Sequence, residues 1–398
     1  MFDTPIPTIS IVMLAISFAG IVICCLYGWQ AYFRASKPQD PDVPEGDEYD
    51  SDYPSASVIV YADCPEAVLD RTIESMTQED YPDFEIIVVC DAMRDQADLL
   101  NERYAMKYDN VYVTFIPQGS HNVSRRKLAI TSGVKAAKGE IIVTTTGNVE
   151  LPESHRWLRT LLSPFFGYKG KSTDVSLGLS RIPLKDLSGY GRWYKEFDSV
   201  LTNALWIGYA TMGKAFRGDG YNLAFRRSVF IEHKGYARTI NLHNGDDDLF
   251  ISEISKPGNT QVVITPDTVL PTVWPDGADV IWTNRKEGYN FTEKWLRKGP
   301  FIREFVSNLM QWIIPGAAVT GLLTALPNLI GLILGVVVIL IYWAFETWLY
   351  LMLAKNLCTD AKWYRVMPFW TFRLPANIIF RILHHRRSKL NFTWVRTS

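Results

Sequence analysis

Apolar stretches at both ends of the chain are long enough to cross a membrane. The stretch from Ile9 to Gly28 has no charged residue and is about the twenty residues that a spanning helix needs. A second apolar zone, from Phe305 to Ala354, contains Glu346 as its only charge and is too long for one crossing. A turn at Pro327-Asn328 divides it into two predicted helices, near 305–325 and 329–354.

Between these stretches, short β-branched runs alternate with segments of helical spacing, which is typical of an open α/β sheet flanked by helices. The predicted strands are 57–61, 84–89, 111–116 and 140–144, and the predicted helices are 65–78, 94–108 and 124–137. Ligands on such sheets bind beyond the carboxyl ends of the strands. We therefore expect site residues at Asp63, at Asp91 and in the run Thr145 to Glu150.

Basic residues lie on one side of the apolar stretches. Arg34 and Lys37 follow the first stretch, and the last 44 residues hold nine Lys or Arg against the single acid Asp360. Because basic residues concentrate on the cytoplasmic side, we predict a multi-pass inner-membrane protein with its N-terminus outside and its α/β domain and C-terminus in the cytoplasm. A cleaved signal peptide is the alternative to an N-terminal anchor, but only Asp3 stands where a basic region is expected.

These features divide the chain into five parts. They are an anchor at 1–33, an acidic proline-rich linker at 34–54, an α/β domain at 55–300, two membrane helices at 301–354, and a basic, aromatic tail at 355–398. We expect the tail to lie on the lipid bilayer through its aromatic and basic side chains. Glu346 is either a functional intramembrane carboxylate or a residue paired near an interface.

Composition narrows the function further. The chain has 398 residues, is 47% hydrophobic and carries a formal charge of −1, which excludes a disordered chain and a globally basic nucleic-acid binder. Its five cysteines are scattered and include no CxxC pair, so neither a disulfide scaffold nor a zinc site is expected.

Four segments carry a family resemblance. They are VVCDAMRD, SRRKLAITSGVKAAKGEIIVTTT, GDGYNLAFRRSVF and NGDDDLFI. In order and spacing the chain resembles the family 2 glycosyltransferases of the GT-A fold, and in layout their membrane-embedded branch, similar to synthases of cellulose, hyaluronan and poly-N-acetylglucosamine. The resemblance implies a Rossmann-like open mixed sheet. It also implies an inverting transfer from a nucleotide-diphosphate sugar to a glycan or lipid-linked acceptor, with partner membrane proteins as a further expectation.

The run Asn244-Gly245-Asp246-Asp247-Asp248 offers the carboxylates for this chemistry. Three adjacent acids repel one another, which raises the proton affinity of at least one of them. The resemblance places the catalytic base on Asp247, with Asp246 as second choice. A calcium loop or a helix N-cap is the structural alternative.

The resemblance also suggests donor-binding residues. Asp91 matches the acid that contacts the nucleobase, although by itself such a residue is more often a turn former. Arg126 and Lys127 begin a predicted helix and either face the nucleotide or form a solvated basic face. Gly220 lies in a glycine turn that resembles the one beside the donor, where backbone amides can approach a ligand, and an ordinary tight turn is the alternative.

The chain departs from the family where a metal is expected. The Asp-x-Asp of the family falls on Thr145-Thr146-Gly147-Asn148, so Thr146 and Asn148 stand in for the acids that hold Mg or Mn. Hydroxyl and amide oxygens are poor ligands for these cations. The first-strand motif is altered too, with Asp63-Cys64-Pro65 at that place.

The acceptor end is partly kept. The family's Gln-x-x-Arg-Trp is best matched by Phe291-Thr292-Glu293-Lys294-Trp295, in which the tryptophan remains. Lys294 and Arg297, with Lys127, are candidates to neutralise the departing diphosphate. Trp193 is a candidate for stacking on a sugar, while core or membrane-surface packing is the alternative. A degenerate relative that binds nucleotide or a partner synthase without catalysis is the second hypothesis.

Overall fold

A computed structural model describes residues 5–39, 41, 43, 53–91, 94–117, 123–166, 173–184, 187–273, 277–326, 328–366 and 369–392. Internal contacts group the chain into two units. The membrane-helix unit comprises Met1–Lys37, Ser188–Gly208 and Arg297–Leu383, and the sheet unit comprises Pro38–Leu187, Tyr209–Leu296 and His384–Ser398. Most of the predicted linker, Pro327 of the predicted turn and the last residues of the predicted tail lie outside the described residues.

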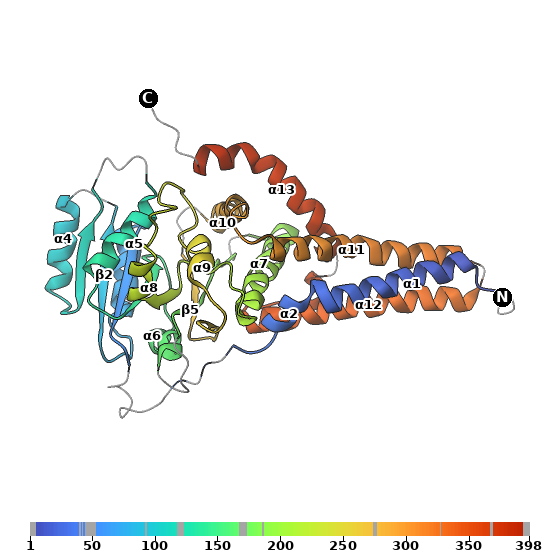
Figure 1. The fold of residues 1–398 in the computed structure, drawn as a ribbon, viewed down its shortest axis with the longest axis horizontal. Coiled ribbons are helices and arrows are strands. Elements are labelled where there is room, and N and C mark those ends of the chain that lie inside the picture. The colour runs from blue at the N-terminus through green and yellow to red at the C-terminus, as the bar shows by residue number, and fades with distance from the viewer. Residues whose placement is uncertain are drawn as a thin grey trace. The chain divides into compact units, whose positions relative to one another are not determined.

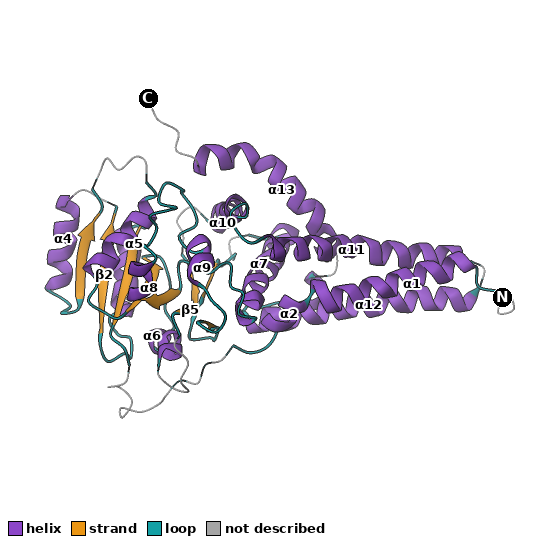
Figure 2. Cartoon of the chain, in the orientation of Figure 1, coloured by secondary structure: helices purple, strands orange, loops and turns teal. Residues whose placement is uncertain are grey.

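The sheet unit is built on a mixed sheet of seven strands in the order β3-β2-β1-β4-β7-β5-β8 (Figure 2). The first four strands run parallel, and β7 runs antiparallel to both β4 and β5. The bounds are β1 Ala56–Ala62, β2 Phe84–Cys90, β3 Val111–Phe115, β4 Ile141–Thr146, β5 Val175–Leu177, β7 Leu223–Arg226 and β8 Thr260–Val262. A separate pair consists of β6 Leu179–Arg181 and β9 Val269–Pro271.

The predicted alternation of strands and helices in residues 57–144 is confirmed. Helices α3, α4 and α5 follow β1, β2 and β3 at Glu66–Met76, Arg94–Ala105 and Arg125–Ala136. Ser124 caps α5 by accepting a hydrogen bond from the backbone N–H of Lys127, which explains why the helix begins there. Further helices in this unit are α6 Trp157–Leu162, α8 Arg227–Glu232, α9 Asp248–Ile254 and α10 Ala278–Thr292, with a 3-10 turn at Ser163–Phe165.

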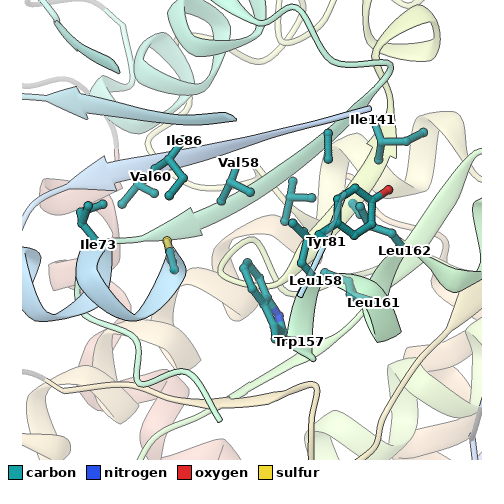
Figure 3. Close-up of a cluster of buried hydrophobic side chains, with 14 of the residues drawn as sticks. Val58, Val60, Ile73, Tyr81, Ile86, Ile141, Trp157, Leu158, Leu161 and Leu162 are labelled. Carbon is teal, nitrogen blue, oxygen red and sulfur yellow. The ribbon is translucent and has the colours of Figure 1, made fainter. Parts of the chain in front are cut away.

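Apolar side chains from β1, β2 and β4 form the core under the parallel strands (Figure 3). Val58, Val60 and Ile86 belong to one buried cluster with Ile73 of α3 and Trp157 of α6, and each is at most 1% exposed. Burying such side chains contributes about 1.5–3 kcal/mol each. The rigid core fixes the strands whose carboxyl ends carry the site.

The membrane-helix unit contains three helices that are long and apolar enough to cross a membrane: Thr8–Gly28, Lys298–Thr324 and Leu329–Asn356. The first joins α1 Thr8–Ile23 to a π-helical turn at Cys24–Gly28, and the others are α11 Lys298–Thr324 and α12 Leu329–Asn356 (Figure 1). The remaining elements are α2 Gln30–Ala35, α7 Gly189–Thr211, a 3-10 turn at Trp363–Arg365 and α13 Phe369–Phe392, where α7 and α13 each extend past the unit boundary.

Small residues bring these helices together. A Cβ on Gly20 would lie 2.7 Å from Ile314, and one on Gly335 would lie 2.8 Å from Leu322. Hydrogen bonds add to this packing, since the Ser17 hydroxyl donates to the Ile314 carbonyl across 3.0 Å. Close backbone approach at small residues is the usual way in which membrane helices associate.

The segment Ser188–Gly208 falls in the predicted domain 55–300 but groups with the apolar helices. A Cβ on Gly208 of α7 would overlap the carbonyl of Ala31 in α2. Arg373 of α13 is 2% exposed and pairs with Asp198 of α7 at 3.2 Å and with Glu304 of α11 at 2.9 Å. The beginning of the predicted tail is therefore held to this unit by a buried ion-pair network, in which loss of one partner would leave a buried charge unpaired.

Candidate functional site

A cavity of about 680 Å³ opens in the sheet unit beyond the carboxyl end of β1. This is the place where ligands bind on open α/β sheets. Charged and aromatic side chains predominate in its wall, which is formed by Tyr61, Asp63, Arg125, Arg126, Asp219, Gly220, Tyr221, His243, Asn244, Gly245, Asp246, Asp247, Asp248, Ile281, Asn284, Arg285, Gly288, Tyr289 and Thr292.

The acid loop, residues 244–248, places its three aspartates on this wall. Gly245 has a φ of +94°, a backbone conformation that residues other than glycine rarely adopt, so the loop turns sharply before the acids. Asp247 accepts hydrogen bonds from the backbone N–H of Asp248 at 2.7 Å and of Gly220 at 3.3 Å. A Cβ on Gly220 would come within 2.9 Å of Asp246, so glycine there allows the close approach of the loop.

The acids of the loop differ in their surroundings. Burial raises the pKa of Asp247 well above its usual value, and the neighbouring charges of Asp248 and Asp246 raise it further. Asp248 lies on the wall but is 1% exposed and accepts a hydrogen bond from Thr292, so its carboxylate is engaged within the protein. A carboxylate of raised proton affinity on a cavity wall has the properties of a general base. Asp247 also caps α9, so the structural alternative is observed, and the role as a base stays a prediction.

Arg126 pairs with Asp246, the first of the three acids in the loop. Its Nε atom lies 2.5 Å from Asp246 Oδ2, and its Nη2 atom donates to the Gly220 carbonyl at 2.8 Å. The guanidinium also lies over the ring of Tyr221 at 4.2 Å from the centroid. Desolvation opposes the charge of Arg126, but the nearby acids, led by Asp246, outweigh it and raise the pKa of the guanidinium, so it stays charged.

Helix α10 supplies a face of the cavity that our sequence analysis missed. Ile281, Arg285, Gly288 and Thr292 follow one another at helical spacing along the wall. Arg285 donates to the Ser180 hydroxyl at 2.9 Å, and its guanidinium lies 5.3 Å from the centre of the Tyr221 ring. Two guanidinium groups therefore lie near this ring, that of Arg126 from α5 and that of Arg285 from α10. The helical spacing of 281–292 was the signal that could have revealed this face.

Asp91 lies one side chain away from the cavity wall. The guanidinium of Arg125 binds both of its oxygens, with Nε at 3.1 Å from each, and the Tyr61 hydroxyl donates to it at 3.2 Å. The hydrogen bonds from Arg125 are the main reason why the pKa of Asp91 is lowered. Asp91 is thus an ionised carboxylate, and its predicted contact with a nucleobase stays a prediction.

Lys127 is occupied by the protein itself. Its ammonium group is fully buried and donates to the carbonyls of Thr239, Leu242 and Asn244 at 2.7, 3.1 and 2.8 Å. Burial lowers its pKa to about 8. These bonds use all three donors of the side chain and hold the segment that leads into the acid loop. Lys127 does not line the cavity, in contrast to Arg126.

The residues at the end of β4 do not fit a divalent cation. Thr146 and Asn148 are fully buried and do not line the cavity. Thr146 donates to Asp63 at 2.9 Å, and the Asn148 amide donates to the carbonyl of Val273 at 2.8 Å. Asn148 Oδ1, a neutral oxygen, has no hydrogen-bond partner among the described residues. The described residues also contain no group of three or more His, Cys, Asp or Glu side chains that could hold a metal ion. Mg or Mn prefers charged oxygens that this position lacks.

The predicted acceptor residues lie outside the cavity wall. Lys294 is exposed and its ammonium group lies 4.0 Å from the centre of the Trp295 ring, which is 46% exposed. Arg297 and Trp193 belong to the membrane-helix unit, where Arg297 precedes α11 and Trp193 packs edge-on against Tyr364. Their roles toward an acceptor or a diphosphate remain predictions.

Comparison with known proteins agrees with the fold of the sheet unit. No curated protein matched the sequence. The mannosyltransferase PcManGT of Pyrobaculum calidifontis, solved with GDP-mannose and Mn²⁺, aligns with a TM-score of 0.51 at 18% identity over 89% of this chain and 100% of its own. S. aureus TarS residues 1–349, solved with UDP, align with a TM-score of 0.38 at 16% identity over 66% of this chain and 70% of theirs, a similarity too low to support an argument.

The alignment with the mannosyltransferase shows the fold of the chain. An identity of 18% shows nothing about the substrate. Residues 55–168, which include β1 to β4, match the family model of glycosyl transferase family 2. The chain therefore has a GT-A fold, and its residues 55–168 are similar to glycosyl transferase family 2.

Proposed function

We propose that the protein is a membrane-bound inverting glycosyltransferase that moves a sugar from a nucleotide-diphosphate sugar to a glycan or lipid-linked acceptor. The observation that carries the proposal is the acid loop on the wall of a cavity at the strand ends of a family 2 domain. A fold alone does not define an activity, so the proposal depends on the chemistry of these side chains.

Asp247 acts as the base in this proposal. It takes the proton of the acceptor hydroxyl while the hydroxyl oxygen bonds to the anomeric carbon of the sugar. The bond from that carbon to the diphosphate oxygen breaks, and its electron pair leaves with the nucleoside diphosphate. Attack from the side opposite to the leaving group inverts the anomeric centre. The raised pKa of Asp247 favours this role, because a stronger base accepts the proton more readily.

The nucleotide binds beyond the ends of β1 and β2 in this proposal. Asp63 and Tyr61 line that part of the cavity, and Asp91 with Arg125 forms an ionised pair beside it. Asp91 accepts from an N–H of the base, as the family resemblance suggests. We also propose that the protein resembles the membrane-embedded polysaccharide synthases and acts together with partner membrane proteins.

We further propose that the protein spans the inner membrane and that its acceptor is delivered there. Three candidate membrane spans support the first part. Helix α13 supports a surface contact, since Ile379, Ile382 and Leu383 are 55%, 70% and 72% exposed and lie beside the basic Arg381. An apolar face with basic neighbours is what holds a helix on anionic lipid.

The direct test is turnover of a panel of UDP-, GDP-, CDP- and dTDP-sugars by the full-length protein in detergent. We expect slow release of the nucleoside diphosphate from at least one donor, and loss of this release in Asp247→Asn with donor binding retained. Glu232→Gln, a change outside the cavity wall, serves as the matched carboxylate control. Binding without turnover in the wild-type protein would contradict the proposal.

A non-catalytic role is the second candidate, because Thr146 and Asn148 replace the acids expected for metal binding and are fully buried. In that case the cavity binds a nucleotide for regulation or helps to recruit a partner synthase. Thermal stabilisation by a nucleotide in a protein that releases no product from any donor would favour this candidate, since a ligand selective for the folded state raises the melting temperature.

A further inference from the structure

We propose that Arg126 and Arg285 bind the diphosphate of the donor in place of a divalent cation. This inference rests on the proposed function and concerns the same cavity. The geometry points to it: two guanidinium groups, from α5 and α10, lie near the Tyr221 ring on the wall that also carries the acid loop.

The guanidinium of Arg126 lies among oxygen atoms, as a metal cation would. Asp246 Oδ2 and the Gly220 carbonyl lie 2.5 and 2.8 Å from its nitrogens, and Asp63 acts on it through its charge. Its Nη1 group has no hydrogen-bond partner among the described residues, so a donor remains for a ligand. A guanidinium is a planar fork that matches phosphate oxygens and stays charged when it is partly buried.

Arg285 provides the second positive group. It bonds to Ser180, a neutral partner, at 2.9 Å through Nη2, and its nearest carboxylate, Asp219, is 3.9 Å away. Asp219 is itself satisfied by the backbone N–H and the hydroxyl of Ser180 at 2.7 and 2.6 Å. The charge of Arg285 is therefore only partly compensated within the protein, which favours an anion beside it.

The remaining acids do not cancel these charges. Asp248 lies against Arg217 and Thr292, and Asp91 pairs with Arg125. Asp247 accepts hydrogen bonds from the backbone N–H of Asp248 and of Gly220, and Asp63 accepts one from Thr146, so both carboxylates are engaged within the protein. The basic residues that our sequence analysis favoured are less suitable, because Lys127 is consumed by three carbonyls and Lys294 lies outside the wall.

The experiment measures binding of UDP, GDP, CDP and dTDP, and of the corresponding monophosphates, to the full-length protein in detergent by calorimetry. For the nucleotide that binds best, we expect the affinity for the diphosphate to change less than about twofold when EDTA is added. We expect Arg126→Ala and Arg285→Ala each to weaken diphosphate binding by about 10- to 100-fold and to affect the monophosphate less, since charge-assisted bonds to the outer phosphate are lost.

Three controls keep the result interpretable. Lys286→Ala removes a basic residue next to Arg285 that does not line the cavity, and we expect its affinities to be unchanged. The double variant Arg126→Ala/Asp246→Asn removes both charges of the buried ion pair. It therefore shows whether Arg126→Ala weakens binding because a ligand contact is lost or because an unpaired Asp246 unfolds the protein. Methylguanidinium at millimolar concentration should restore part of the diphosphate affinity of Arg126→Ala, whereas Mn²⁺ should not.

Each contrary result has a defined meaning. Loss of diphosphate binding with EDTA and its recovery with Mn²⁺ would overturn the inference and leave the proposed function standing. An unchanged ratio of diphosphate to monophosphate affinity in both arginine variants would do the same. Failure of the wild-type protein to bind any of the nucleotides would overturn the proposed function and the inference together.

Discussion

The acid loop and the end of β4 lie in the same unit but have opposite properties. Residues 244–248 hold three carboxylates on the cavity wall, and Gly220 allows them to lie close to the opposite backbone. Thr146 and Asn148 hold no charge, are fully buried and bond to protein groups instead. Carboxylates therefore line the cavity, whereas the position that matches the family's Asp-x-Asp carries buried neutral side chains.

In our proposal, this contrast explains how a chain with a GT-A fold can lack the acidic pair at the end of β4 and still keep carboxylates on the cavity wall. The end of β4 follows a parallel strand, whereas the acid loop lies between α8 and α9 and is held by the bond from Lys127 to the Asn244 carbonyl, so the two segments have separate supports. In our proposal, Arg126 and Arg285 on the cavity wall supply the positive charge that a cation would otherwise provide.

The largest effect is expected at the acid loop. Asp247→Asn should lower kcat by about 10²- to 10⁴-fold, because the amide cannot accept the proton of the acceptor hydroxyl. Initial rates with a saturating donor measure this loss, and KM for the donor should stay nearly constant. A variant that retains more than a tenth of the wild-type rate would break the assignment of the base.

The next effect concerns the end of β4. Thr146→Asp/Asn148→Asp recreates the acidic pair of the family but places it where both side chains are fully buried. We expect destabilisation by about 3–5 kcal/mol, since buried charges without partners are costly. Thermal unfolding in detergent measures it. A double variant as stable as the wild type that gains Mn²⁺-dependent turnover would instead show an intact metal site.

Gly220 gives a smaller, steric effect. Gly220→Ala would bring a Cβ within 2.9 Å of Asp246 and 3.3 Å of Asp247, so we expect a loss of about 1–3 kcal/mol in stability together with reduced activity. Gly191→Ala is the matched control, because nothing lies within 4 Å of the added Cβ. Equal behaviour of the two variants in thermal melts and rate measurements would mean that the loop does not need the close approach.

The smallest effect is on the pH dependence of stability. The folded pKa of Asp247 lies above its ordinary value of 3.8, so the folded state binds more protons than the unfolded chain between these two values. Stability from this group is therefore present below 3.8 and is lost as the pH rises through the folded pKa.

Asp247→Asn removes this penalty, and we expect a gain on the order of 1 kcal/mol at pH 8, about 2–4 °C in melting temperature. Melting curves of both proteins at pH 5 and pH 8 test the sign. A larger gain at pH 5 than at pH 8 would contradict it.

Sequence reasoning recovered the first four strands and the three intervening helices because β-branched runs and helical spacing act locally. The strand predicted at 57–61 is Ala56–Ala62, and the helix predicted at 124–137 is Arg125–Ala136 with Ser124 as its cap. The acid loop was found as well, since three adjacent aspartates after a glycine are conspicuous.

Contacts between distant segments could not be predicted in this way. The bond from Lys127 to Asn244 joins residues 117 positions apart, and no local pattern reveals that the lysine serves the loop rather than a ligand. Arg285 went unnoticed because the helical spacing of 281–292 indicates a face of a helix but not that this face lines the cavity. The grouping of Ser188–Gly208 with the apolar helices likewise depends on the contact of Gly208 with Ala31.

The most direct test of the central claim is a structure of the full-length protein bound to a nucleotide sugar. The account predicts that the anomeric carbon lies beside Asp247, with the diphosphate against the guanidinium groups of Arg126 and Arg285. A nucleotide bound elsewhere, with Asp247 turned away from the sugar, would contradict it.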